Sequence, residues 1–63
     1  MDRNEIIATI KNLANIQGFY GRLYMALVEL MAEKPRRYNA IMTTLEKEHF
    51  NDATELILYF ECR

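Results

Sequence analysis

One glutamate and one histidine have a spacing that could bind a metal ion. Glu46 and His49 form a Glu-x-x-His pair, so both side chains would project from one face of a helix. Di-iron helical bundles use two such pairs and two further glutamates. A symmetric dimer would supply the second pair, with Glu29 or Glu33 as the further ligand. The alternative is a packing role, with His49 at the end of an apolar stripe near a helix C-terminus. We expect the packing role, with no metal or other cofactor.

Other catalytic arrangements find no support in the sequence. Serine is absent, and the single cysteine, Cys62, lies one residue from the end of the chain. A catalytic thiol needs a base held beside it in a rigid site, and His49 has no evident group to orient it. No phosphate-binding glycine loop is present. We therefore expect that the protein is not an enzyme.

A basic cluster in the middle of the chain stands out against a net charge of −1. Such a cluster could contact an acidic protein surface or phosphates, and its third-helix residues could enter a DNA groove. DNA-binding domains are usually more basic than this chain. The simpler alternative is a solvated surface in which nearby glutamates pair with the cations. The basic residues are Arg22, Lys34, Arg36 and Arg37, and the glutamates are Glu29 and Glu33.

The spacing of apolar residues predicts two amphipathic helices in the first half of the chain. Asp2, followed three residues later by Glu5, forms a capping-box pattern at the start of the first helix. That helix should end near Gly18, placed in the left-handed conformation that glycine adopts after a helix. Gly21 then falls in the first turn of a second helix over about 19–33, where it permits close approach of a neighbour. The alternative, a G-x-x-G nucleic-acid loop, is disfavoured because the two middle residues are bulky aromatics.

The sequence pattern in the second half of the chain predicts two more helices. Pro35 suits the first turn of a third helix, where its missing amide hydrogen costs nothing. Asp52, with Glu55 three residues later, repeats the capping pattern and favours a short fourth helix over 56–60. Five consecutive apolar residues at 56–60 could also form a short buried strand. We expect an all-α fold, a single domain over 1–63 with three main helices and a short C-terminal helix in a compact bundle.

The second helix is apolar around most of its circumference, with a narrow polar line through Arg22, Glu29 and Glu33. A helix of this kind is normally buried. In a chain of 63 residues it is either central or part of a subunit interface, so we expect self-association as a homodimer. Tyrosine and methionine are enriched at interfaces and adapt to partners. The residues expected in an exposed apolar patch are Tyr24, Met25 and Val28.

The sequence contains no signal for export or for membrane insertion. The first residues, MDRNE, lack the apolar run of a signal peptide. Glu29 interrupts the longest apolar stretch before it reaches the length of a membrane span. A single free thiol fits a reducing compartment. We expect a cytoplasmic protein with no membrane partner.

Two stretches resemble small uncharacterised helical proteins encoded by tailed phages and prophages. They are QGFYGRLY at 17–24 and HFND at 49–52, which leads into 56–61. The similarity covers most of the chain, and no activity is assigned to those proteins. The resemblance implies a location in the cytoplasm of a bacterial host. Small phage proteins of this type often bind and redirect a host protein.

Together these observations favour a non-enzymatic protein–protein interaction module, with the resemblance implying a phage or prophage modulator of a host process. Its partners would be a second copy of itself and an unidentified host protein. The alternative is a small nucleic-acid-binding regulator that uses the four basic residues. A di-metal site in a dimer, with Glu46 and His49, is a distant third.

Overall fold

A computed structural model describes residues 1–61 of the chain, and Cys62 lies outside the described residues. The helices are α1 (Arg3–Leu13), α2 (Gly18–Glu33), α3 (Pro35–Lys47) and α4 (Ala53–Glu61). The predicted all-α fold, with three main helices and a shorter fourth, is confirmed. The strand alternative for 56–60 is wrong, because these residues lie inside α4. Over the described part of the chain, no helix has both the length and the apolar character to cross a membrane.

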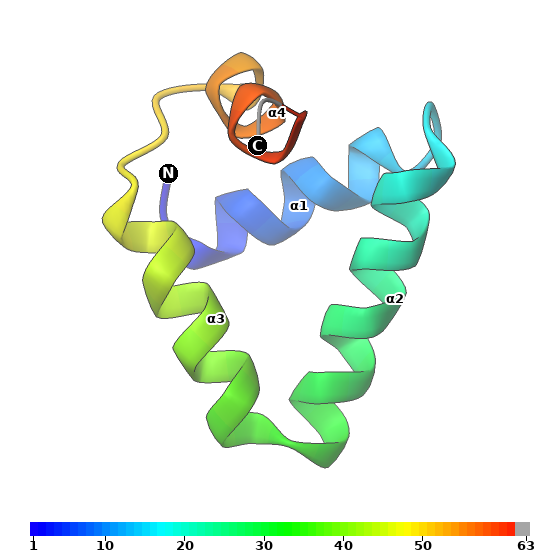
Figure 1. Cartoon of the computed structure of the whole chain (residues 1–63), viewed down its shortest axis with the longest axis vertical. Helices are drawn as coiled ribbons and strands as arrows, with labels where there is room; N and C mark the ends of the chain where they lie inside the picture. The colour runs from blue at the N-terminus through cyan, green and yellow to red at the C-terminus, as the bar shows by residue number, and fades with distance from the viewer. Residues whose placement is uncertain (62–63) are drawn as a thin grey trace.

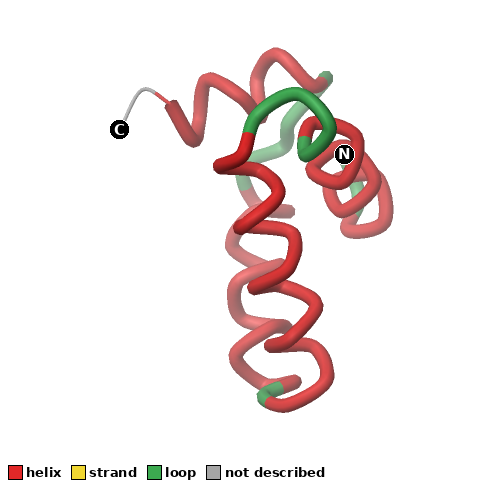
Figure 2. Tube along the Cα trace, turned by 90° about the vertical axis from the view of Figure 1, so that its right-hand side faces the viewer, coloured by secondary structure: helices red, strands yellow, loops and turns green. Residues whose placement is uncertain are grey.

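The two longest helices, α2 and α3, form a hairpin. They are joined at Lys34, which forms the tip of the hairpin, and they diverge toward the opposite end. Figure 1 shows α1 crossing the open end of this hairpin, with α4 beside it. In Figure 2, α1 and α4 lie on opposite sides of the hairpin at one end, while its tip projects free. The covered end therefore holds the core, and the tip is left to the solvent.

All four helices contribute to one apolar core. In α1 to α3 the buried residues recur three, four or seven positions apart, which puts them on one helix face. Phe50, in the loop before α4, joins the same cluster. The buried residues are Ile6, Ile10, Tyr20, Leu27, Met42, Leu45, Phe50 and Leu56.

Two helices begin with the capping bonds that the sequence predicts. At α1, the Glu5 N–H donates to Asp2 Oδ1 at 2.8 Å and the Asp2 N–H donates to Glu5 Oε1 at 3.2 Å. At α4, the Glu55 N–H donates to Asp52 Oδ1 at 3.0 Å. The return bond differs, because Glu55 Oε1 accepts from the Asn51 N–H at 3.0 Å. Both caps satisfy amide groups that a helix start leaves without partners.

The glycine corner differs from its prediction in one respect. Gly18 does not end α1 in a left-handed conformation, because it is the first residue of α2 and neither glycine has a positive φ. The chain instead leaves α1 at Ala14, whose φ of −59° and ψ of −26° are right-handed. Gly21 lies in the first turn of α2, as predicted, and a Cβ there would lie 4.0 Å from Ala14. The G-x-x-G loop alternative is wrong, since both glycines are helical.

Within residues 1–61, the residue with a left-handed backbone is His49, with a φ of 54°. It directly follows the α3 cap residue Glu48, and its N–H donates to the Glu46 carbonyl at 3.2 Å. This is the position that glycine usually takes after a helix. The predicted packing of His49 on the apolar stripe of α3 is therefore wrong, because the residue is exposed and lies beyond the helix.

We expect His49→Gly to raise the free energy of unfolding by about 1 kcal/mol, because a side chain in the left-handed region costs about 1–2 kcal/mol. The greater freedom of glycine in the unfolded chain offsets part of this gain. Urea unfolding followed by circular dichroism measures the change. The matched control, Glu48→Gly, replaces a right-handed residue and should instead destabilise the fold by about 1 kcal/mol. Equal losses in both variants would contradict the prediction.

Candidate functional site

A polar junction built on Arg3 joins the start of α1 to α3. Its Nε and Nη2 donate to Glu46 Oε1 at 3.1 and 3.0 Å, and its Nη1 donates to Asn39 Oδ1 at 2.7 Å. A longer contact of 3.4 Å reaches Thr43 Oγ1, and the guanidinium lies 5.9 Å from the centre of the Tyr38 ring. The junction fixes where α1 crosses the hairpin.

Glu46 of this junction is also one half of the Glu-x-x-His pair, which the sequence offered only as a distant third possibility. Glu46 accepts two bonds from Arg3, and His49 lies beyond the end of α3, so the two side chains do not share a helix face. Within the described residues, no group of three or more His, Cys, Asp and Glu side chains could hold a metal ion. The sequence did carry a signal for the junction, because Asn39, Thr43 and Glu46 recur at helical spacing beside the apolar stripe of α3.

Three of the four predicted basic residues lie together at the exposed tip of the hairpin: Lys34, Arg36 and Arg37. Arg22 lies near the other end of α2, about 18 Å along the helix axis from Lys34 at 1.5 Å per residue. The predicted patch of four is therefore divided. The predicted pairing of these cations with glutamates is not found either, since the ion pair within residues 1–61 joins Arg3 to Glu46.

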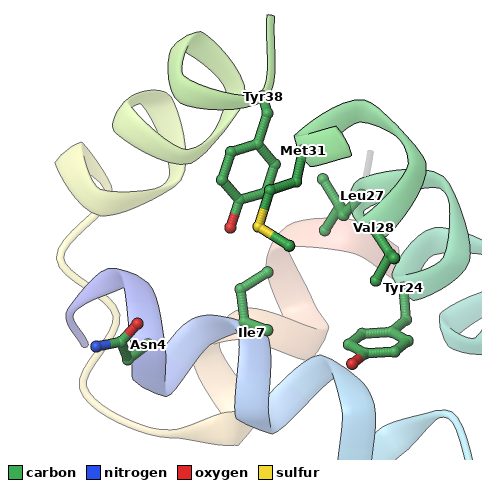
Figure 3. A pocket seen from close by; sticks show the side chains of 7 residues that line it. All are labelled: Asn4, Ile7, Tyr24, Leu27, Val28, Met31 and Tyr38. Atoms are coloured by element: carbon green, nitrogen blue, oxygen red, sulfur yellow. The ribbon is translucent and has the colours of Figure 1, made fainter. Parts of the chain in front are cut away.

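An apolar hollow of about 190 Å³, here called the α1-side hollow, lies between α1 and the hairpin. Figure 3 shows the side chains of Ile7, Tyr24, Met31 and Tyr38 converging on it from three helices. Met31 follows Leu27 by one turn and continues the core stripe, but it lies beyond the cover of α1 and is 52% exposed. The full lining is Asn4, Ile7, Tyr24, Leu27, Val28, Met31 and Tyr38.

A second hollow of about 210 Å³, here called the α4-side hollow, lies between the hairpin and α4. Its walls are also apolar except for Thr44. Leu27, which is only 3% exposed, lines both hollows and so separates them. The lining residues are Leu23, Leu27, Ile41, Thr44, Leu45, Tyr59 and Phe60.

The three residues of the predicted apolar patch, Tyr24, Met25 and Val28, do not lie together. Tyr24 and Val28 both line the α1-side hollow, whereas Met25 lies in a shallow groove on the outer face of α2 and is 57% exposed. α2 is thus not buried around its circumference, and its surplus apolar residues face the solvent in two directions. The groove is lined by Gly18, Gly21, Arg22, Met25, Ala26 and Glu29.

The chain matches no family model, no curated protein and no solved structure. The resemblance to phage and prophage proteins therefore stays a prediction from the sequence. The surface of residues 1–61 includes the two apolar hollows, the shallow groove around Met25 and the three cations at the hairpin tip.

A buried tyrosine hydroxyl lies beneath the α2 and α4 aromatic residues. The Tyr20 ring meets those of Phe19 and Phe60 edge-on, with centroids 5.1 and 6.3 Å away, and is almost fully buried. Its hydroxyl has no hydrogen-bond partner within the described residues. Burial raises the pKa of Tyr20 above its usual value of 10.0, and the Glu61 carboxylate adds to the rise. The buried position therefore stabilises the neutral phenol.

We expect Tyr20→Phe to raise the free energy of unfolding by about 1 kcal/mol, because it removes a buried hydroxyl without a partner. It should also change the response to alkali. Above pH 10.0 the unfolded chain loses the Tyr20 proton while the folded chain keeps it, so stability falls as the pH rises toward the raised pKa. Urea midpoints measured across this pH range should fall less steeply in the variant.

The matched control is Tyr38→Phe, which removes the hydroxyl of a half-buried tyrosine at the α1-side hollow. It should change stability by less than about 0.5 kcal/mol and leave the Tyr20 contribution to the alkaline fall in place. An alkaline fall that is equally steep in Tyr20→Phe would contradict the assignment.

Proposed function

We propose that this protein is a non-enzymatic protein–protein interaction module, and that its partner docks at the α1-side hollow beside the hairpin tip. The observation that supports this most directly is that the buried apolar face of α2 continues beyond the part that α1 covers. Met31 lies on the same helix face as buried Leu27, yet half of its surface is exposed above an apolar hollow. Apolar surface that lines a hollow on a monomer is typical of an interaction site.

The size and lining of the hollow fit a side chain of a partner protein. At about 190 Å³ it is smaller than the roughly 300–1,000 Å³ typical of small-molecule sites. Tyr24 and Tyr38 lie at its edge, and tyrosine supplies both apolar contact and a hydrogen-bonding hydroxyl at interfaces. An apolar anchor residue inserted between them would bury the exposed part of Met31.

The charge at the tip determines the chemistry expected of the partner. Lys34 joins α2 to α3, because its N–H donates to the Leu30 carbonyl at 2.7 Å and its carbonyl accepts from the Tyr38 N–H at 3.0 Å. It therefore lies next to the hollow, and Arg36 follows two residues later. Neither forms an ion pair within residues 1–61. A partner with carboxylates beside its apolar anchor would complement both features and be steered toward them.

The sequence resemblance supports a bacterial host protein as this partner, with the module acting as a phage or prophage modulator in the host cytoplasm. Modules of this kind need no catalytic residues, since they act by occupying a surface of their target.

The test compares tagged wild-type protein with two variants in capture from nuclease-treated bacterial lysate. Met31→Glu places a charge in the hollow and should abolish capture of a stoichiometric host protein. Lys34→Glu should weaken its binding about tenfold or more, measured by calorimetry with the purified partner. The matched control, Lys47→Glu, makes the same charge change at the other end of α3 and should bind as wild type does. Equal capture by wild type and Met31→Glu would refute docking at this hollow.

A second candidate, a nucleic-acid-binding regulator, is favoured by the three cations at the tip, none of which forms an ion pair within residues 1–61. Three phosphate contacts predict a salt slope of about −2.7, so affinity for duplex DNA should fall roughly 40-fold between 50 and 200 mM salt. Fluorescence anisotropy with Arg36→Glu plus Arg37→Glu as the negative variant measures this. Binding that is absent at 50 mM salt would exclude the candidate.

A further inference from the structure

The outer face of α2 carries a stripe of four exposed residues that points away from the core. Gly18, Arg22, Met25 and Glu29 follow one another at intervals of four, three and four residues, which keeps them on one side of the helix. The buried residues of α2, Tyr20 and Leu27, lie on the opposite side. The stripe coincides with the shallow groove that surrounds Met25.

The charges of this stripe are arranged symmetrically. Arg22 lies three residues before Met25, and Glu29 lies three residues after Ala26. A second copy of α2, antiparallel about a two-fold axis between Met25 and Ala26, would place Arg22 opposite Glu29 of the second copy. The same two-fold operation places Glu29 of the first copy opposite Arg22 of the second copy, because an isologous interface forms each contact two times.

Neither charge forms an ion pair within residues 1–61, and the exposed Arg22 side chain, which lies beside Gly18, can turn to meet an opposing carboxylate. Within one chain they are seven residues apart, about 10.5 Å along the helix axis at 1.5 Å per residue, so they do not pair with each other. The ion pair of the described residues, Arg3 with Glu46, involves neither of them. Glu29 also has Glu33 one turn away on the same helix, and an opposing arginine would relieve that repulsion.

The residues at the axis favour close packing. Met25 would meet its counterpart at the axis and bury apolar surface that is now 57% exposed. Ala26 beside it has only a methyl side chain, so the two helices can approach closely at the axis. Complementary charges on both sides of this apolar contact would set the register.

We propose that a second copy of the chain docks antiparallel on this face of α2, held by two Arg22–Glu29 ion pairs around Met25. The proposal does not depend on the function proposed above, because the α1-side hollow is lined from the other side of α2. The homodimer would leave both hollows open and present two of each. It would then engage a partner with two sites more strongly than a single copy could.

Sedimentation equilibrium of the full chain tests the arrangement by charge reversal. Arg22→Glu and Glu29→Arg should each weaken dimerisation about tenfold or more, because each creates two like-charge contacts. The double variant, Arg22→Glu with Glu29→Arg, restores opposite charges and should dimerise as wild type does. Arg36→Glu, a charge reversal at the tip, and Met31→Glu, in the hollow, should leave dimerisation unchanged. Circular dichroism should show that all variants fold, since the replaced residues are exposed.

Either of two results would overturn the proposed dimer. A wild-type chain that stays monomeric up to about 1 mM has no dimer of useful affinity. A double variant that dimerises no better than the single variants has no Arg22–Glu29 register. Loss of host-protein capture in Met31→Glu, with dimerisation intact, would test the hollow separately.

Discussion

Replacing Leu27 with alanine is expected to lower the free energy of unfolding by about 2–5 kcal/mol, the usual cost for a buried leucine. Leu27 is only 3% exposed and forms the wall between the two hollows. Truncation would join the hollows and let water reach the core from both sides of the hairpin. A core this small rarely supplies more than about 3–5 kcal/mol in total, so most or all of the folded population should be lost at 37 °C.

Thermal unfolding followed by circular dichroism measures this loss. The matched control is Met31→Ala, which truncates a half-exposed residue one turn further along the same face of α2. That change should cost less than about 1 kcal/mol, since little burial is lost. A cooperative transition of Leu27→Ala at the wild-type temperature would place the core elsewhere. The pair also separates stability from binding, because both residues line the α1-side hollow but only one holds the fold together.

The helices were predictable because their signals are local. Apolar spacing, a proline at the first position of α3 and aspartate caps at Asp2 and Asp52 all act within a turn or two of the backbone. Each was confirmed by the structure. Even the ambiguous run at 56–60 was settled correctly by the Asp52 cap, which a strand would not use.

The helix ends were less predictable, because a glycine can serve more than one role. Gly18 is the first residue of α2. Among residues 1–61 the left-handed conformation is instead adopted by His49, whereas the rule for helix ends favours glycine. α1 stops at Leu13 because its apolar stripe ends there. Ile16, beyond this point, is 76% exposed, so extending the helix through it would bury little further apolar surface.

The candidate site was only partly predictable, because it depends on how far each helix covers its neighbour. A helical wheel places Tyr24 and Val28 among the apolar residues of α2, and both line the α1-side hollow, but the wheel cannot reveal that α1 leaves Met31 open. Nor can it separate Met25, which faces away from both hollows. The Arg3–Glu46 pair joins positions 43 residues apart in the chain, and only the tertiary arrangement brings them together.

Replacing Leu56 with alanine is the second change with a large expected effect, because it acts on the weakest attachment in the fold. α4 spans 9 residues, too short to stay helical alone in water. It is held by fully buried Leu56 and by aromatic contacts, including Phe60 on Tyr20 and Tyr59 on Phe50. We expect a loss of about 2–5 kcal/mol, beginning with release of α4 from the covered end of the hairpin.

Release of α4 has a specific spectroscopic consequence. Tyr20 would become exposed once Phe60 leaves, so its raised pKa should return toward 10.0. Ultraviolet titration of the phenolates, together with hydrogen exchange of the α4 amides, detects both changes. Leu58→Ala is the matched control on the same helix, since Leu58 is 52% exposed and its truncation should cost less than about 1 kcal/mol. If the Leu56 variant kept a raised Tyr20 pKa and slow exchange in α4, the helix would be held by its aromatic contacts alone.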